Sequence, residues 1–115
     1  MKLITPVIKS WDCPDHDPLE DWVPEDRAVT DFWINLAIGI EGEAGADNFQ
    51  VHVVTRRALS QVGNKEFILV LPYYEGVDQV ISAINERIGS IQELSWDAVA
   101  KRLSAMFRWE FDGLR

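Results

Sequence analysis

The sequence predicts an α+β fold, in which a mainly antiparallel sheet of about four to five strands carries two C-terminal amphipathic helices packed on it. Two patterns support this fold class: apolar and polar residues alternate from Asp31 to Val54, and apolar residues follow helical spacing after Val77. The chain has 115 residues, of which 47% are hydrophobic and 26% are charged. We therefore expect one domain over residues 1–115, large enough to bury roughly two-thirds of the surface that its unfolded chain exposes.

The first half of the chain predicts three strands. Lys2–Trp11 is expected to form an edge strand because it contains Pro6, which cannot donate a ladder hydrogen bond. A second strand starts at Asp31, where apolar residues occupy every even position as far as Ile40. Phe49–Val54 continues the alternation after a glycine-rich turn, which predicts a hairpin with a loop longer than two residues.

The second half predicts a short helix, a strand, two long helices and a closing strand. Arg56–Val62 is expected to form the short helix, and the unbroken apolar run Phe67–Leu71 predicts a central strand covered on both faces. The apolar spacing of Val77–Ile91 predicts one amphipathic helix, and Ser95 is a suitable N-cap for a second. Residues 108–112 alternate again and predict a strand that closes the sheet.

The negative charge of the chain is concentrated in its first part. Residues 1–48 contain eleven acids and three bases, a net charge of −8, whereas residues 49–115 contain eight of each. Seven of the acids lie within residues 12–26, a stretch with three prolines and no base, which predicts an ordered acidic loop. Such a field repels phosphate backbones and anionic lipid surfaces and attracts basic proteins. The charge therefore argues against nucleic acid or membrane as the partner.

The candidate partner-binding residues are the acids of this loop, one tryptophan within it and three acids around the predicted hairpin. They are Asp12, Asp15, Asp17, Glu20, Asp21, Trp22, Glu25, Asp26, Glu41, Glu43 and Asp47. The hairpin acids are expected to lie near the loop. Trp22 has two interpretations, a loop anchor or an exposed interface residue, whereas the tryptophans at periodic positions, Trp33, Trp96 and Trp109, are expected in the core.

Catalytic and metal-binding patterns are weak, and we expect no catalytic residue, metal or cofactor. Cys13 and His16 supply two ligands, but a structural zinc site needs four, and His52 is the only other histidine. Carboxylates around Cys13 raise the pKa of a thiol, which disfavours a nucleophile. A single cysteine allows no internal disulfide and fits a reducing compartment, and Met1–Pro6 does not form a secretory signal, so the expected location is cytoplasmic.

Three segments resemble the immunity protein 8 family of bacterial polymorphic-toxin systems. They are Val23-Pro24-Glu25-Asp26, the hairpin Gly42-Glu43-Ala44-Gly45-Ala46-Asp47-Asn48-Phe49, and Trp109-Glu110-Phe111. The resemblance implies a small cytoplasmic protein that binds and neutralises a toxin domain and is not an enzyme. One segment departs from the family pattern, because Thr55-Arg56-Arg57-Ala58-Leu59 stands where a Thr-Pro-Lys-Trp-Leu-like segment is expected.

We therefore expect a toxin-neutralising immunity protein whose acidic surface blocks a basic toxin domain, with a nuclease as the best fit. The main alternative is a general interaction module for basic proteins, which would bind many of them with similar affinity. A small hydrolase that uses Cys13 or a carboxylate pair is a weaker alternative. The sequence does not indicate an oligomeric state.

Overall fold

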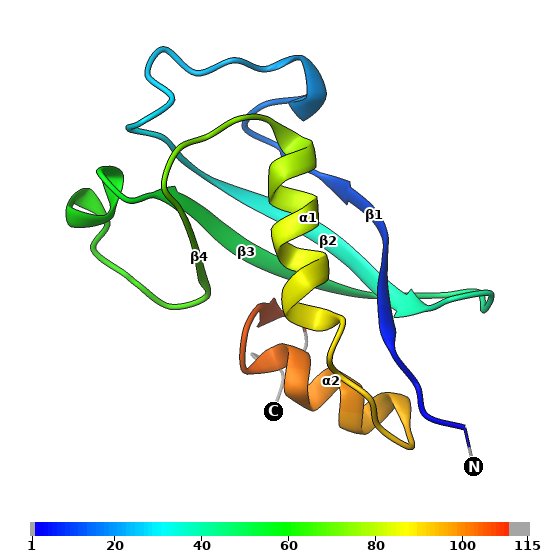
Figure 1. Ribbon diagram of the computed structural model, residues 1–115. Helices are drawn as coiled ribbons and strands as arrows, with labels where there is room; N and C mark the ends of the chain where they lie inside the picture. Colours follow the sequence, from blue (N-terminus) through cyan, green and yellow to red (C-terminus); the bar gives the residue numbers. More distant parts are fainter. Residues whose placement is uncertain (1, 111–115) are drawn as a thin grey trace.

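A mixed five-stranded sheet forms the centre of the computed structural model, which describes residues 2–110 (Figure 1). Its strands are β1 (Pro6–Asp12), β2 (Asp31–Ile40), β3 (Asp47–Thr55), β4 (Ile68–Leu71) and β5 (Arg108–Trp109). The order is β1-β2-β3-β4, and β5 pairs with β3 beside Phe49 and Gln50. Only the β3–β4 pairing is parallel. The predicted α+β class with a mainly antiparallel sheet is confirmed.

The β2–β3 hairpin is the longest pairing in the sheet and follows the predicted alternation. Phe32, Ile34 and the other even positions to Ile38 are buried, and Ile34 pairs with Val51 of β3. The connecting turn uses Gly42 and Gly45 at positive φ values of 81° and 91°, a conformation that residues with a Cβ atom rarely adopt. Alternation places these apolar side chains on one face of the sheet, where they form its core.

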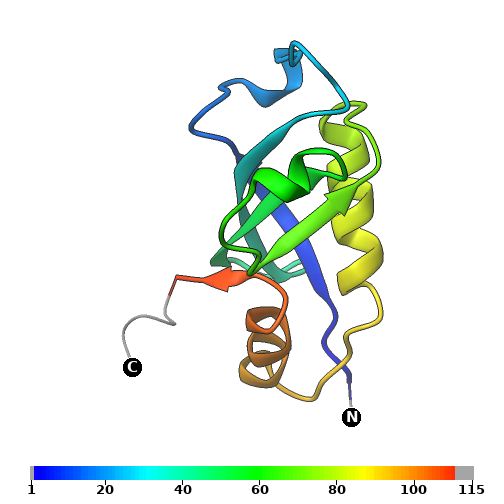
Figure 2. The same ribbon diagram turned by 90° about the vertical axis from the view of Figure 1, so that its left-hand side faces the viewer.

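Two helices cover that apolar face, α1 (Val77–Ile88) and α2 (Trp96–Ser104). Figure 2 shows α1 lying along one side of the sheet. Val80 and Ile84 face the core, and the Ser95 hydroxyl caps α2 by accepting a hydrogen bond from the backbone N–H of Ala98 at 3.2 Å. The first helix ends at Ile88 rather than at the predicted Ile91. The chain turns after Ile88, where the Ile91 N–H donates to the Ile88 carbonyl, and this turn leaves Ile91 buried although it is no longer helical.

β4 corrects one prediction. It lies at the end of the sheet order and is not a central strand covered on both faces. Its Leu69 and Leu71 are buried, whereas Val70 is 38% exposed on the other face. An unbroken apolar run therefore marks a strand here but does not show how many neighbours the strand has.

The remaining elements differ from prediction mainly in their bounds. β1 begins at Pro6, as an edge strand, and the predicted helix at residues 56–62 is a 3₁₀ turn at Ala58–Gln61. β5 confirms a closing strand at residues 108 and 109, but Glu110 already lies in a turn, and the last two residues of that predicted strand, 111 and 112, lie outside the described residues. Among the described residues, no helix combines the length and the apolar character that a membrane crossing requires.

Candidate functional site

The acidic loop connects the end of β1 to the start of β2 at one end of the sheet (Figure 1). Asp12 is the last residue of β1, and residues 13–26 contain one short 3₁₀ turn, Leu19–Asp21, and otherwise no regular element, as the prolines predicted. All seven of its carboxylate side chains belong to exposed residues. They are Asp12, Asp15, Asp17, Glu20, Asp21, Glu25 and Asp26.

Trp22 anchors this loop to the body of the protein. Its ring stacks on the imidazole of His16, with centroids 3.7 Å apart and an angle of 12° between the planes. It also contacts the rings of Phe32 and Tyr74, at centroid distances of 5.6 Å and 5.5 Å. Leu19, which is 3% exposed, adds a second apolar contact with the core. Of its two interpretations, the structure supports the anchor, because Trp22 is half-buried among aromatic rings.

Hydrogen bonds fix the last part of the loop, just before β2. The carboxylate of Asp26 accepts from the backbone N–H of Ala28 at 2.9 Å, and its carbonyl accepts from the Thr30 hydroxyl at 2.7 Å. Arg27 donates from Nη1 to the Tyr74 carbonyl at 3.0 Å, and the Tyr74 backbone N–H donates back to the Arg27 carbonyl at 2.8 Å. These contacts hold the exposed carboxylates on an ordered backbone, which reduces the entropy lost when a partner binds.

The hairpin acids lie at the other end of β2, contrary to the expected proximity. Asp31 and Ile40 bound this strand, and nine residue steps separate them, which corresponds to about 30 Å. Glu41 and Glu43 are exposed beside the turn. Asp47 is half-buried and accepts a hydrogen bond from the Trp96 indole at 2.8 Å. The candidate acids therefore form two separate groups, and a role of the hairpin acids in binding stays a prediction.

The candidate nucleophile Cys13 is buried and only 1% exposed. Burial is the main cause that raises the pKa of its thiol, and the charges of Asp15 and Asp12 act in the same direction. Its neighbour in sequence, His16, has its ring stacked on Trp22, and His52 lies on β3. Within residues 2–110, no group of three or more histidines, cysteines and carboxylates could hold a metal ion. The geometry gives Cys13 no access to a substrate.

Trp33 corrects a second prediction, because it lies on the face of the sheet that points away from the apolar core. It is half-buried, and its ring stacks on the His52 imidazole with centroids 4.8 Å apart and planes 11° apart. Nε2 of His52 is 2.8 Å from Oδ2 of Asp31. The outward position of Trp33 follows from the alternation along β2. Because Phe32 and Ile34 face the core, the odd positions between and around them must face the other side of the sheet.

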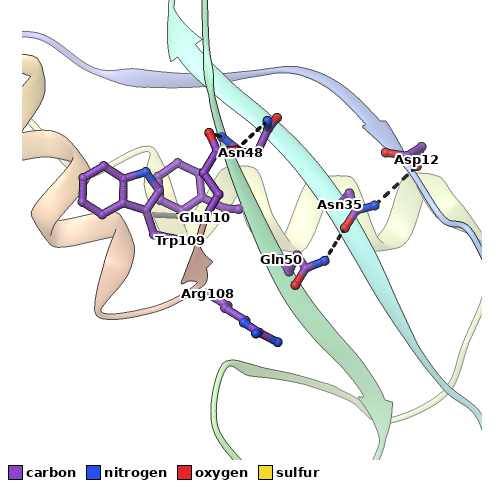
Figure 3. Close-up of a pocket in the computed structure, with 8 residues that line it drawn as sticks. Asp12, Asn35, Asn48, Gln50, Arg108, Trp109 and Glu110 are labelled. Atoms are coloured by element: carbon purple, nitrogen blue, oxygen red, sulfur yellow. Dashed lines mark hydrogen bonds between the residues drawn. The ribbon is translucent and has the colours of Figure 1, made fainter. Parts of the chain in front are cut away.

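A polar groove lies on the same face and was not predicted (Figure 3). It encloses about 510 Å³ between residues of β1, β2, β3 and β5. Gln50 donates from Nε2 to Oδ1 of Asn35 at 2.8 Å, and Asn35 donates from Nδ2 to Oδ2 of Asp12 at 3.4 Å. Asn48 and Glu110 form a second hydrogen-bonded pair at its rim, at 3.2 Å. The only signal in the sequence was the set of polar residues at odd positions of β2 and even positions of β3.

The model of one protein family, Immunity protein 8, matches residues 6–113 of the 115-residue chain. The chain belongs to this family. The earlier resemblance in the loop, hairpin and terminal segment is thereby confirmed. Comparison with curated proteins and with solved structures gave no match.

As an immunity protein, the chain acts against a bacterial toxin, which is its cognate partner. The polymorphic-toxin setting that the resemblance implied is consistent with this family. The segment that departs from the expected family pattern, residues 55–59, lies where β3 ends and the 3₁₀ turn Ala58–Gln61 begins. Arg56 and Arg57 are exposed there.

Proposed function

We propose that this immunity protein neutralises its toxin by covering a cationic surface with the acidic loop of residues 12–26. The observation that carries the proposal is the exposure of seven carboxylates on an ordered backbone with no lysine or arginine among them. Among the described residues, none of the seven forms an ion pair. Their charge is therefore available to a partner.

A nuclease is the toxin class that this surface fits best. A nuclease must present a cationic groove, because it holds a phosphate backbone. The exposed carboxylates of the acidic loop would occupy the same groove and exclude the nucleic acid. Inhibition of this kind needs binding alone, which agrees with the buried position of the Cys13 thiol. We infer an inhibitor that is not an enzyme, that acts in the cytoplasm, and that binds neither nucleic acid nor membrane.

Charge complementarity acts mainly on the rate of association. Opposite fields raise the association rate by a factor of about 10 to 1,000 at low salt, and the gain falls when salt screens the charges. The screening length is about 10 Å at 0.1 M salt, so it affects exposed carboxylates strongly. An acidic loop that steers the toxin must therefore produce a rate with a steep salt dependence.

The test removes the charge of four loop residues and keeps their size. The variant carries Asp15→Asn, Asp17→Asn, Glu20→Gln and Asp21→Asn. We expect its association with the toxin domain encoded beside its gene to be about 10-fold slower or more at 20 mM NaCl. The difference should shrink at 300 mM NaCl. Stopped-flow or surface plasmon resonance measures both rates.

A matched control neutralises four exposed acids elsewhere in the chain. It carries Glu66→Gln, Glu75→Gln, Asp78→Asn and Glu86→Gln. This control has the same net charge as the test variant, so a smaller effect on the rate assigns the steering to the loop. Equal rates and salt slopes for the test variant and the native protein would refute the proposal. Equal affinity for unrelated basic proteins would favour the general interaction module instead.

A further inference from the structure

The face of the sheet opposite the core leaves a continuous stretch of β2 and β3 without a helix over it. We define the open face by the half-buried residues Trp33, Asn35, Ala37 and Gln50 and the two residues that border them, Asp12 and Asp31. Even positions of β2 are buried against α1 and α2, whereas these odd positions are not. In Figure 2, α1 lies on the other side of the sheet.

Trp33 is held rigidly on this face. Its ring stacks on His52, which is only 7% exposed, and Asp31 fixes the imidazole through the contact of 2.8 Å with Nε2. A tryptophan that is already ordered loses little conformational entropy when a partner packs against it. Tryptophan is also enriched among the residues that contribute most to protein–protein binding. Trp33 therefore has the properties of an interface anchor.

The polar residues beside Trp33 are ordered as well. The hydrogen bonds from Gln50 to Asn35 and from Asn35 to Asp12 run across three neighbouring strands (Figure 3). They fix the orientation of both amides beside the groove of about 510 Å³. A site built from fixed amides discriminates against partners that leave them unpaired, because a buried unpaired polar group costs about 1–3 kcal/mol.

Two acids near Trp33 favour a basic occupant on that part of the open face, whereas Arg108, the partner of Gln50 on β5, adds one cation to the groove. Sheet register places Trp33 between Asp31, two residues before it, and Asn35, whose cross-strand neighbour is Asp12. Asp12 and Asp31 each use one carboxylate oxygen in the contacts described above, namely Oδ2. A lysine or arginine side chain placed over an indole and beside carboxylates gains both cation–π and ionic attraction. The same negative charge opposes pairing with a second copy of the chain.

The open face is also continuous with the acidic loop. Asp12 is the last residue of β1 and Asp31 is the first residue of β2, so both border the open face and flank the loop between the two strands. A partner that covers the loop could therefore also contact Trp33, because the loop and the open face form one continuous surface.

We propose that the open face is a second contact surface for the cognate toxin, and that it seats a basic side chain of the toxin against Trp33 between Asp12 and Asp31. The inference rests on the proposed function. The acidic loop speeds association, whereas the open face slows dissociation and discriminates between toxins. The two contributions can be separated because they act on different rate constants.

The test uses two substitutions on this face. Trp33→Ala removes the anchor, and Ala37→Arg places a bulky cation on the same strand without removing a core side chain. We expect each to raise the dissociation rate of the complex with the toxin domain by at least 10-fold, while the association rate changes less than threefold. Asn35→Ala should raise the dissociation rate by a smaller factor, about threefold. Circular dichroism and thermal unfolding confirm that each variant is folded.

Matched controls lie away from the open face. Leu94→Ala removes an apolar side chain that is 60% exposed between the two helices, and Ala105→Arg adds the same cation after α2. Both should leave the dissociation rate unchanged. The proposal is overturned if Trp33→Ala and Ala37→Arg also leave it within twofold of the native value.

The outcome also separates the two proposals. If the open-face variants have no effect but loss of the loop charges slows association, the acidic loop alone binds the toxin and this inference fails. If neither set changes binding, both proposals fail. If sedimentation shows a dimer that Ala37→Arg dissociates, the face joins two copies of the chain and the inference fails as well.

Discussion

Cys13 and Tyr74 are the residues whose ionisation the fold changes most clearly. Burial raises the pKa of the Cys13 thiol above its ordinary value of 9.0 and that of the Tyr74 hydroxyl above 10.0. A negative charge on Cys13 would raise the pKa of Tyr74 further. Both groups are therefore neutral in the native protein at pH values where the unfolded chain has begun to lose these protons.

The free energy of unfolding should respond to this difference at alkaline pH. Because both native pKa values are raised, the stabilisation is complete below about pH 9 and declines as the pH rises further. Urea unfolding between pH 7 and pH 10.5 measures the decline. In Cys13→Ser the part of the decline that begins near pH 9 should be lost, while the part due to Tyr74 remains. Unfolding free energies that stay constant to pH 10.5 would contradict the prediction.

Two tryptophans show what sequence reasoning predicts at this scale. The acidic loop around Trp22 was predicted from its prolines and charges, whereas the stacking of Trp22 on His16, which supports the anchor, is a contact that the sequence does not show. Trp33 was assigned to the core because aromatic residues on strands usually lie there. Its odd position on β2 was the better guide, since the even positions already supplied the buried face.

At the level of the elements, the packing of the β2–β3 hairpin predicts that a substitution at Gly39 destabilises the protein. A Cβ atom at this position would lie 2.6 Å from the Gly45 carbonyl oxygen, a backbone atom that cannot move alone. We expect Gly39→Ala to lower the free energy of unfolding by about 1–3 kcal/mol, as overpacking usually does. Gly63→Ala is the control, because nothing lies within 4 Å of the added atom. Equal urea midpoints for the two variants would show that the hairpin tolerates the extra methyl group.

The periodicity of apolar residues predicted where most helices and strands lie in the chain. It did not predict which elements lie next to one another in the fold. The alternation of β2 and β3 and the helical spacing of α1 and α2 reflect local backbone geometry, which a sequence records directly. The edge position of β4 depends on which strands pair, and an apolar run such as residues 67–71 is the same in either case. The loop and hairpin acids were expected together, yet the ten residues of β2 keep them apart. The open-face groove joins residues from four strands, so no local pattern could place it.

For the whole molecule, the uneven charge predicts a stability that depends on salt. The net charge is −8, and seven acids lie in the loop without a base among them. Their mutual repulsion destabilises the compact state, and salt screens it. We expect thermal unfolding to shift upward by a few degrees, about 2–6 °C, between 10 and 300 mM NaCl.

The variant with four neutralised loop acids provides the comparison for this shift. Its melting temperature should be higher than that of the native protein at 10 mM NaCl and should depend less on salt. Differential scanning calorimetry at a fixed scan rate measures both proteins. A melting temperature that falls with NaCl in the native protein would mean that attractive charge pairs outweigh the repulsion.

The two-residue repeat of β2 has a consequence for how this protein can change over generations. Phe32, Ile34 and Leu36 maintain the fold, whereas Trp33 and Asn35, between them in the chain, face outward. A mutation at an outward position can alter partner choice with little damage to the core, although the two kinds of position alternate along one strand. If the open face binds the toxin as proposed, a lineage that meets a new toxin can change its contact residues by single substitutions while the buried side chains of the same strand stay unchanged.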